Sequence, residues 1–349
     1  SGIAAFKQLP NTRNVVYSPL SANQVMAMLA DGAVGTTQSQ ILRVLGGKPN
    51  QSNSADSDIL KLTNSGWLQQ GFPMNQQYRD TLKGDFNASL QTVDFTEPDA
   101  AMRAINQAVS QQTNGLIAQL LNKPLSNKTR LALISTVNFD GKWVHPFLAT
   151  ELTPFYVDGT KPELRNIMQV TNQFQYLDTG KLQVIALPYV GGRYALWVVL
   201  PEQRDANIKQ LVQSLTLKQI NQWQQAMTQK NVIVKLPKFD FASRLDLKPV
   251  FEALGIKQAF NPQTANFNGI SSKLGLYVSV LLQQARIQVN EAGTKAAAST
   301  LAGMNLKMVA PIVPAGTETF NANHPFVFMI RDQKTGQMIF IGRVVDPDS

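Results

Sequence analysis

An alanine-rich segment reads NEAGTKAAAST over residues 290–300 and continues as LAGMNLKMVAPIVPAGTE over residues 301–318. Alanine has the highest helix propensity, and Glu291 precedes Lys295 by four residues, the favourable order for an ion pair on a helix. Gly293 and the pair Ser299 and Thr300 weaken a helix, and strand-like sequence surrounds the run. Propensity alone therefore favours neither a helix nor an extended segment.

Outside this segment, the chain divides into an early part rich in helices and a later part rich in strands. Helical spacing of apolar residues predicts helices over 20–45, 98–121 and 247–254, and the polar stretch 46–57 predicts a loop. Strands are predicted over 131–139, 231–241, 285–290, 326–331 and 338–345, with a hairpin in 182–200 that turns at Gly191 and Gly192. This order predicts an α+β fold.

Composition limits the possible function classes. The chain has 349 residues, of which 44% are hydrophobic, and no cysteine. It can therefore build a large core without disulfides, and it lacks both thiol nucleophiles and thiolate metal ligands. No apolar run reaches the length of a membrane span, so no membrane association is expected. The net charge of +9 is scattered along the chain. We interpret it as a solubilising surface, with a polyanion as a weaker alternative partner and no specific nucleic acid.

The motifs of common enzymes are missing. His145 and His324 are each followed by Pro-Phe, a context more typical of structural histidines, and two histidines without cysteine make a zinc site improbable. The sequence contains no glycine-rich nucleotide-binding motif and no G-x-S-x-G elbow. We therefore expect no catalytic activity, no cofactor and no metal ion.

Several stretches, in this order along the chain, resemble the serpin family. They are NVVYSPLSANQVMAMLADGAVGTT (14–37), FDGKWVHPF (139–147), ALPYVGGRYALWVVLP (186–201), LPKFDF (236–241), DLKPVFEALGI (246–256), NEAGTKAAAST (290–300) and FNANHPFVFMIRDQKTGQMIFIGRVVDP (320–347). The resemblance covers nearly the whole chain and implies a single serpin domain over 1–349. It implies three β-sheets surrounded by helices, an exposed reactive-centre loop at about 291–319, and a shortened or missing helix after residue 46.

In this family, the reactive-centre loop enters the central sheet as a new strand after a protease cuts it. The hinge residues at its start would be Glu291, Gly293, Thr294, Ala296, Ala297, Ala298 and Ser299. Small side chains suit entry between two existing strands, and alternate residues from Thr294 carry no charge, so that face can be buried. A ladder of roughly a dozen residues contributes on the order of 10 kcal/mol. The uncut chain would therefore be metastable.

The resemblance implies a suicide-substrate inhibitor that traps a protease as its acyl-enzyme. The usual loop length places the scissile bond between Lys307 and Met308, which suits a trypsin-like serine protease. Leu306 and Met304 are alternative specificity residues, for chymotrypsin-like or elastase-like targets. Two other functions stay open: cross-class inhibition of papain-like cysteine proteases, and a non-inhibitory role as a carrier, chaperone or storage protein.

In this family, a set of residues called here the latch controls opening of the central sheet, and the resemblance implies matching residues in this chain. Glu291 matches a glutamate whose usual partner is Lys238, and Trp143 matches the tryptophan where insertion begins. Ser18, Pro19 and Ser21 match a cluster of small residues beneath the opening sheet. The chain departs from the family where Ser135 replaces an asparagine and Gln283 replaces a histidine. Because glutamine can hydrogen-bond serine, we expect these two replacements to compensate.

Three Asn-X-Ser/Thr sequons, at Asn50, Asn87 and Asn127, would suit a secreted glycoprotein. Together with the resemblance, they predict an extracellular, monomeric inhibitor whose partner is a target protease.

Overall fold

The computed structural model describes residues 2–10, 13–48, 59–115, 117–294 and 313–349. They form two compact units. Unit 1 comprises Ser1–Leu9, Tyr17–Asn138 and Ser243–Ala285, and unit 2 comprises Pro10–Val16, Phe139–Ala242 and Arg286–Ser349. None of the helices in the described ranges is long and apolar enough to cross a bilayer.

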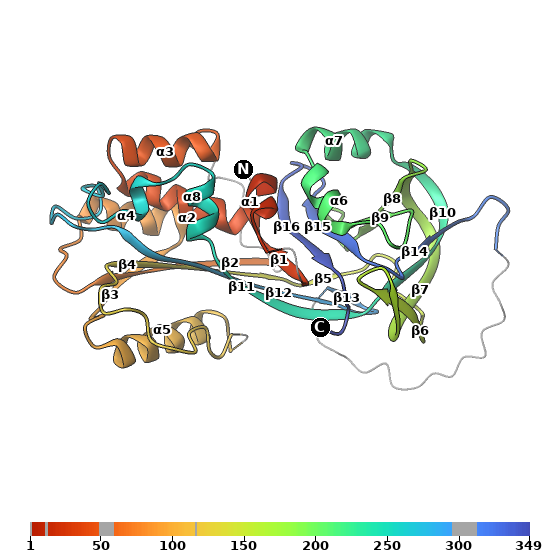
Figure 1. Cartoon of the computed structure of the whole chain (residues 1–349), viewed down its shortest axis with the longest axis horizontal. Helices are drawn as coiled ribbons and strands as arrows, with labels where there is room; N and C mark the ends of the chain where they lie inside the picture. Colours follow the sequence, from red (N-terminus) through yellow and green to blue (C-terminus); the bar gives the residue numbers. More distant parts are fainter. Residues whose placement is uncertain (1, 11–12, 49–58, 116, 295–312) are drawn as a thin grey trace. The chain divides into compact units, whose positions relative to one another are not determined.

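Unit 1 is a sheet with helices on both faces. Its strands are ordered β3 (Ser89–Val93), β2 (Leu60–Gln69), β4 (Leu131–Phe139) and β12 (Val278–Val289), and both β3–β2 and β4–β12 are parallel pairs. Figure 1 shows α2 (Pro19–Gly32) and α3 (Thr36–Leu45) on one side of these strands and α5 (Pro98–Gln112) on the other. The remaining helices are α1 (Gly2–Lys7), α4 (Gln76–Phe86), α8 (Lys248–Ala253) and the short 3-10 helix η2 (Gln258–Phe260).

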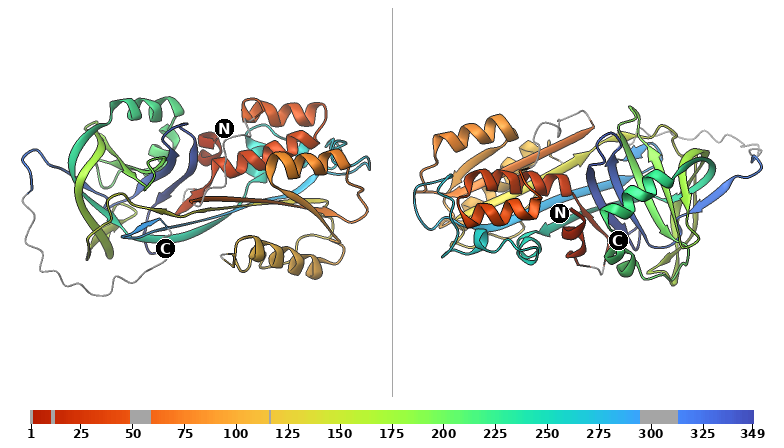
Figure 2. Two further views of the ribbon diagram at one scale, coloured as in Figure 1. Left: turned by 180° about the vertical axis from the view of Figure 1, so that it is seen from behind. Right: turned by 90° about the horizontal axis from the view of Figure 1, so that it is seen from above.

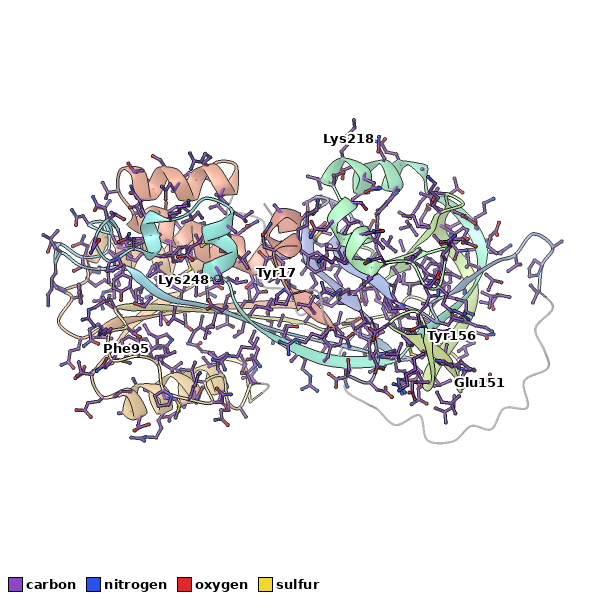
Figure 3. The ribbon with its side chains drawn as sticks, viewed as in Figure 1. Tyr17, Phe95, Glu151, Tyr156, Lys218 and Lys248 are labelled. Atoms are coloured by element: carbon purple, nitrogen blue, oxygen red, sulfur yellow. The ribbon has the colours of Figure 1, made fainter. Side chains whose placement is uncertain are left out.

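Helix α5 is held to the sheet by the apolar stripe that the sequence predicts. Ala101, Ile105 and Val109 recur every four residues and are buried, so they share one helix face. This face packs in one cluster with Trp67 on β2 and with Ala132, Ile134 and Leu282 on the sheet. Phe95, labelled in Figure 3, is fully buried in the same cluster.

Two predicted helices are wrong in their bounds. The helix predicted over 20–45 is interrupted between Gly32 and Thr36, where Gly35 has a φ of 63°, a conformation that favours glycine. The helix predicted over 98–121 ends at Gln112, because Asn114 and Gly115 adopt positive φ angles of 51° and 77°. Residues 120 and 121 are still buried, but outside any helix.

Unit 2 contains a second sheet, ordered β1 (Val15–Tyr17), β16 (Met338–Val344), β15 (Phe326–Asp332), β9 (Tyr194–Pro201), β8 (Leu182–Pro188), β7 (Lys161–Asp178), β10 (Thr228–Pro237) and β14 (Glu318–Asn321). Strand β6 (Ala149–Val157) also pairs with β7. Helices α6 (Ile208–Ser214) and α7 (Leu217–Ala226) lie against this sheet (Figure 2). The predicted hairpin in 182–200 is confirmed as β8 and β9.

The α+β prediction is confirmed, but the expected three sheets occur as two hydrogen-bonded sheets among the described residues. Strand β7 explains the difference, because its 18 residues pair with β6 near their start, with β10 in the middle and with β8 at the end. The strand predicted over 231–241 breaks at Lys238, where β10 gives way to β11 (Phe239–Asp246), which pairs with β12. The predicted helix over 247–254 is confirmed as α8.

The segment after residue 46 connects α3 to β2. Helix α3 ends at Leu45, and Gly46 closes it in a left-handed conformation with a φ of 82°. Strand β2 then begins at Leu60, and the expectation of a shortened or missing helix falls mostly on residues 49–58, which lie outside the described ranges.

Candidate functional site

The start of the predicted reactive-centre loop is a short strand of unit 2. Strand β13 (Gly293–Thr294) lies between the end of β12 and β5 (Gly141–Lys142) and is antiparallel to both. Thr294 pairs with Val289 on one side and with Gly141 on the other. The chain thus reverses directly after β12 and enters a position between two strands.

A tight turn makes this reversal possible. The side-chain oxygen Oδ1 of Asn290 accepts hydrogen bonds from the backbone N–H groups of Ala292 at 3.0 Å and Gly293 at 3.2 Å. The backbone N–H of Asn290 in turn donates to the carbonyl of Gly293 at 3.0 Å. An asparagine whose side chain accepts hydrogen bonds from the backbone N–H groups that follow it stabilises a turn locally.

Glycine is required where β13 meets β5. A Cβ atom on Gly293 would lie 2.1 Å from the carbonyl oxygen of Gly141, which is closer than any real contact. A Cβ atom on Gly141 would lie 2.7 Å from the ring of Tyr189. The two glycines therefore allow the loop, β5 and Tyr189 to pack without a gap.

A column of buried side chains holds Thr294. Its hydroxyl shares a hydrogen bond of 2.6 Å with the phenol oxygen of Tyr189, and only 1% of Thr294 is exposed. The Tyr189 ring stacks on Trp143, with ring centroids 4.6 Å apart and planes 15° apart. Burial raises the pKa of Tyr189, so its phenol stays protonated at physiological pH and can always donate this bond.

Trp143 also fixes the backbone of the turn. Its indole N–H donates to the carbonyl of Asn290 at 2.9 Å, and its backbone N–H donates to the carbonyl of Ala292 at 3.0 Å. Trp143, which the family resemblance assigns to the start of insertion, thus contacts the chain on both sides of Glu291.

The predicted ion pair is present, with a third partner. Lys238 Nζ donates to Glu291 Oε1 at 3.0 Å, and the hydroxyl of Thr150 on β6 donates to the same oxygen at 2.7 Å. Partial burial acts to raise the pKa of Glu291, but the hydrogen bonds from Thr150 and Lys238 outweigh it and lower that pKa. Both charged side chains remain partly exposed, so the pair contributes at most about 1 kcal/mol.

The second predicted cluster lies in unit 1, where β4, β12 and the start of α2 meet. Gln283 on β12 accepts a hydrogen bond from the backbone N–H of Ser18 at 2.8 Å, and its amide nitrogen donates to the carbonyl of Ser18 at 3.0 Å. The hydroxyls of Ser21 and Ser135 hydrogen-bond each other. Gln283 and Ser135 are register partners on the parallel pair β12–β4.

This arrangement differs in one respect from the compensation that the sequence predicts. Gln283 uses both polar atoms of its amide on the backbone of Ser18, and Ser135 bonds Ser21 instead. Ser18 is the N-cap of α2, where its hydroxyl accepts from the backbone N–H of Ser21 at 3.2 Å, and Pro19 is the first helical residue. The cluster therefore ties the β4–β12 pair to the beginning of α2.

The remaining predicted residues are either outside the described ranges or at the surface. Outside them are Ala296, Ala297, Ala298, Ser299, Met304, Leu306, Lys307, Met308 and Asn50. Asn87 and Asn127 are exposed. The histidines have structural contacts: His145 packs edge-on against Phe174, and His324 bonds the carbonyl of Pro201 at 2.7 Å.

Sequence reasoning missed four residues of the turn region: Gly141, Thr150, Tyr189 and Asn290. The first three are distant in sequence from the loop, and no local pattern links them to it. Asn290 had a readable signal, because an asparagine followed closely by glycine is a common turn residue.

Comparison with known proteins shows the family of this chain. A protein-family model described as serpin (serine protease inhibitor) matches residues 2–347. The chain belongs to the serpin family. The sequence resemblance is therefore confirmed over nearly the full length.

Among curated relatives, an uncharacterised serpin-like protein of Methanosarcina acetivorans is 32% identical, with 96% of this chain and 82% of the relative covered. The leukocyte elastase inhibitor of Xenopus tropicalis is also 32% identical, with 96% of this chain and 94% of the relative covered. Among solved structures, the native state of the thermophilic serpin tengpin has a TM-score of 0.89 and 26% identity, covering 99% of this chain and 92% of that one.

Proposed function

We propose that this serpin inhibits a trypsin-like serine protease by inserting its cut reactive-centre loop between β12 and β4. The observation that carries the proposal is the position of β13, which already runs antiparallel between β12 and β5. A strand that continued from Thr294 in the same direction would extend between β12 and β4.

The hydrogen-bond pattern of the sheet supports such an insertion. Strands β4 and β12 form one parallel ladder from Val278 to Ala285. A strand inserted between them would replace this ladder with two antiparallel ladders, and antiparallel pairing is slightly more stable per residue. Each added hydrogen bond contributes about 0.5–1.5 kcal/mol, so a full strand gains on the order of 10 kcal/mol.

The side chains after Thr294 suit the burial that insertion requires. Thr294 is buried within the sheet, and the residues that share its face in a strand are Ala296, Ala298 and Thr300. None carries a charge, and none is larger than threonine. A non-inhibitory role is less well supported, because nothing in this stretch opposes entry into the sheet.

Trapping follows if insertion is faster than hydrolysis of the acyl bond. A protease that remains esterified to the loop would be pulled along with it. Deacylation depends on oxyanion-hole donors and a base that are held in place to within fractions of an ångström. Distortion of the bound protease would therefore stop the reaction at the acyl-enzyme.

Lys307 is the basis of the proposed target class, since a trypsin-like pocket binds a basic residue before the cut bond. Papain-like cysteine proteases are the second candidate, because Leu306 before Lys307 supplies an apolar residue ahead of a basic one.

The experiment is to incubate the chain separately with trypsin and with papain, then to run denaturing electrophoresis and to measure the mass of the released peptide. We expect a complex with trypsin that survives denaturation and a peptide that begins at Met308. Cleavage without any stable complex with either enzyme would refute the inhibitory function. A complex with papain alone would refute the proposed target class.

A further inference from the structure

Unit 2 contains a buried positive charge without a matching negative one. Arg331, on β15, is 2% exposed, and no carboxylate of the described residues forms an ion pair with it. Its Nη2 donates to the carbonyl of Gly336 at 3.2 Å and weakly to Asn221 Oδ1 at 3.4 Å, whereas Nη1 is buried without a hydrogen-bond partner. A buried unpaired charge is strongly unfavourable, so such groups are normally paired.

Two more unsatisfied donors lie near Arg331, one on the same face of the sheet and one in the turn after β15. Trp197, on β9, is fully buried, and its indole N–H has no partner among the described residues. The guanidinium of Arg331 lies over this indole, 4.6 Å from the ring centroid. Trp197 pairs across the strands with Met329, two residues before Arg331, so both side chains are on one face.

The third donor is the side-chain amide of Gln333. Its Nε2 is buried and unpartnered, and its backbone N–H donates to the carbonyl of Arg193, which continues the β15–β9 ladder by one step. Gln333 lies in the turn directly after β15, two residues from Arg331. Helix α7 covers the face of Arg331, because its Asn221 reaches Arg331.

Neighbouring charged groups do not supply the missing acceptor. The carboxylate of Asp332, next to Arg331 in the chain, is bound by Arg193 Nε at 2.8 Å and by the backbone N–H groups of Lys334 and Thr335. Arg343 is buried to the same degree as Arg331, but its guanidinium donates to the carbonyls of Arg13 and Pro10. A buried donor without an acceptor is thus found at Arg331 Nη1 but not on the guanidinium of Arg343.

We propose that Arg331 Nη1, Trp197 Nε1 and Gln333 Nε2 form a binding site for one small monovalent anion of the halide class, such as chloride. A halide accepts hydrogen bonds from several directions and neutralises the guanidinium, whereas a water molecule would leave the charge uncompensated. Sulfate and phosphate are bulkier and are not expected to bind. Gln219 Oε1 on α7 is also buried without a partner, but as an acceptor it takes no part in the site.

Crystals of the full chain soaked in bromide test the site directly, because bromide scatters anomalously and water does not. We expect one anomalous peak within hydrogen-bond distance of Arg331 Nη1. A density feature there that is water only, with no anomalous signal at saturating bromide, would overturn the proposal.

Thermal unfolding gives a second readout in solution. Sodium chloride is compared with sodium gluconate at the same ionic strength, since gluconate is too large for the site. We expect the melting temperature of the wild-type chain to rise with chloride and then to saturate. Arg331→Met should abolish this chloride-dependent rise.

Arg343→Met is the matched control, since it removes an equally buried guanidinium that has carbonyl partners. It should lower the melting temperature but keep the rise with chloride. An equal rise in Arg331→Met and in the wild type would refute the site. If Arg331→Met does not fold, Trp197→Phe, which removes only one donor, replaces it, and the bromide peak of the wild type still decides the question.

Discussion

The phenol of Tyr189 and the hydroxyl of Thr294 are hydrogen-bonded at 2.6 Å, although 105 residues separate them in the chain. Tyr189 directly follows β8, and the described residues stop at Thr294 and resume at residue 313. This bond attaches the beginning of the reactive-centre loop to the fold. Its removal should therefore change how readily the loop leaves or extends its position in the sheet.

Tyr189→Phe removes this bond and leaves the buried hydroxyl of Thr294 without a partner. The loss of a buried partner costs about 1–3 kcal/mol. We expect faster hydrogen exchange over residues 290–294, measured by mass spectrometry on the native chain. Tyr277→Phe removes an exposed phenol that bonds the carbonyl of Lys128, and it should leave this exchange unchanged. Equal protection in wild type and Tyr189→Phe would contradict the role of the bond.

Thr294→Arg places a large charged side chain where only 1% of the native residue is exposed. Burying an unpaired charge costs several kcal/mol, so entry of the loop into the sheet should slow. With trypsin we expect cleavage at the same bond but little or no stable complex, which electrophoresis resolves as a shift from complex to cut inhibitor. Thr160→Arg, the same substitution at an exposed turn outside the loop, is the control and should inhibit normally. Full trapping by Thr294→Arg would argue against insertion.

Glu291 should make the native state sensitive to acid. Its pKa is lowered in the folded chain, so its contribution to stability is complete above the unfolded pKa near 4.3 and is lost as pH falls through the folded value. Glu291→Gln should reduce the free energy of unfolding at pH 7 by at most about 1 kcal/mol. Below pH 5, the melting temperature of this variant should depend less on pH than that of the wild type.

Glu151→Gln is the control for this acid sensitivity, because Glu151 is exposed on β6, as Figure 3 shows. Melting curves from pH 3 to pH 7 should therefore separate the two variants. Parallel curves for Glu291→Gln and the wild type would show that the ion pair has no thermodynamic role.

Gln283→Ala should weaken the closed form of the β4–β12 pair. The substitution leaves the backbone N–H and carbonyl of Ser18 without their buried partner, at about 1–3 kcal/mol for each group. We expect a lower midpoint in guanidinium unfolding and faster complex formation with protease. Gln284→Ala changes the neighbouring residue of β12, which projects from the opposite face, and should have a much smaller effect. An unchanged midpoint in Gln283→Ala would exclude a latch function for the cluster.

Cleavage of the loop should stabilise the chain if the proposed insertion occurs. Limited proteolysis between residues 300 and 312, followed by calorimetry, measures this directly. A new strand adds on the order of 10 kcal/mol of ladder hydrogen bonds, so the cut chain should melt far above the uncut one. Thr294→Arg, cut in the same way, should gain much less.

The sequence predicted those features that depend on local patterns. The hairpin of β8 and β9, the helix α8 and the apolar stripe of α5 follow from spacing and turn residues, and all three are present. The spacing of apolar residues did not predict where helices end. In 98–121, buried apolar residues continue to Leu121, although residues in the left-handed conformation have already ended the helix.

The site was predicted only where the family resemblance supplied it. The pairing of Lys238 with Glu291 came from that resemblance, and the contribution of Thr150 did not. The contact of Tyr189 with the loop could not be predicted from the sequence. Its aromatic ring fits the pattern of any buried hairpin residue, and its hydrogen-bond partner is set by tertiary packing. The resemblance identified Gln283 as the replacement of a histidine. Residue types alone could not predict that Gln283 hydrogen-bonds the backbone of Ser18 and not the side chain of Ser135.

The turn at Asn290 has a kinetic consequence. Adding a strand resembles other cooperative ordering processes, in which the first contact is entropically the most expensive and each later residue adds a bond at a smaller cost. Because Thr294 is already paired with Val289 on one side and Gly141 on the other, the initiation step has been taken before any protease arrives. The rate of loop insertion would then depend only on the addition of further residues to this strand. Insertion would therefore compete with hydrolysis of the acyl bond without a slow first step.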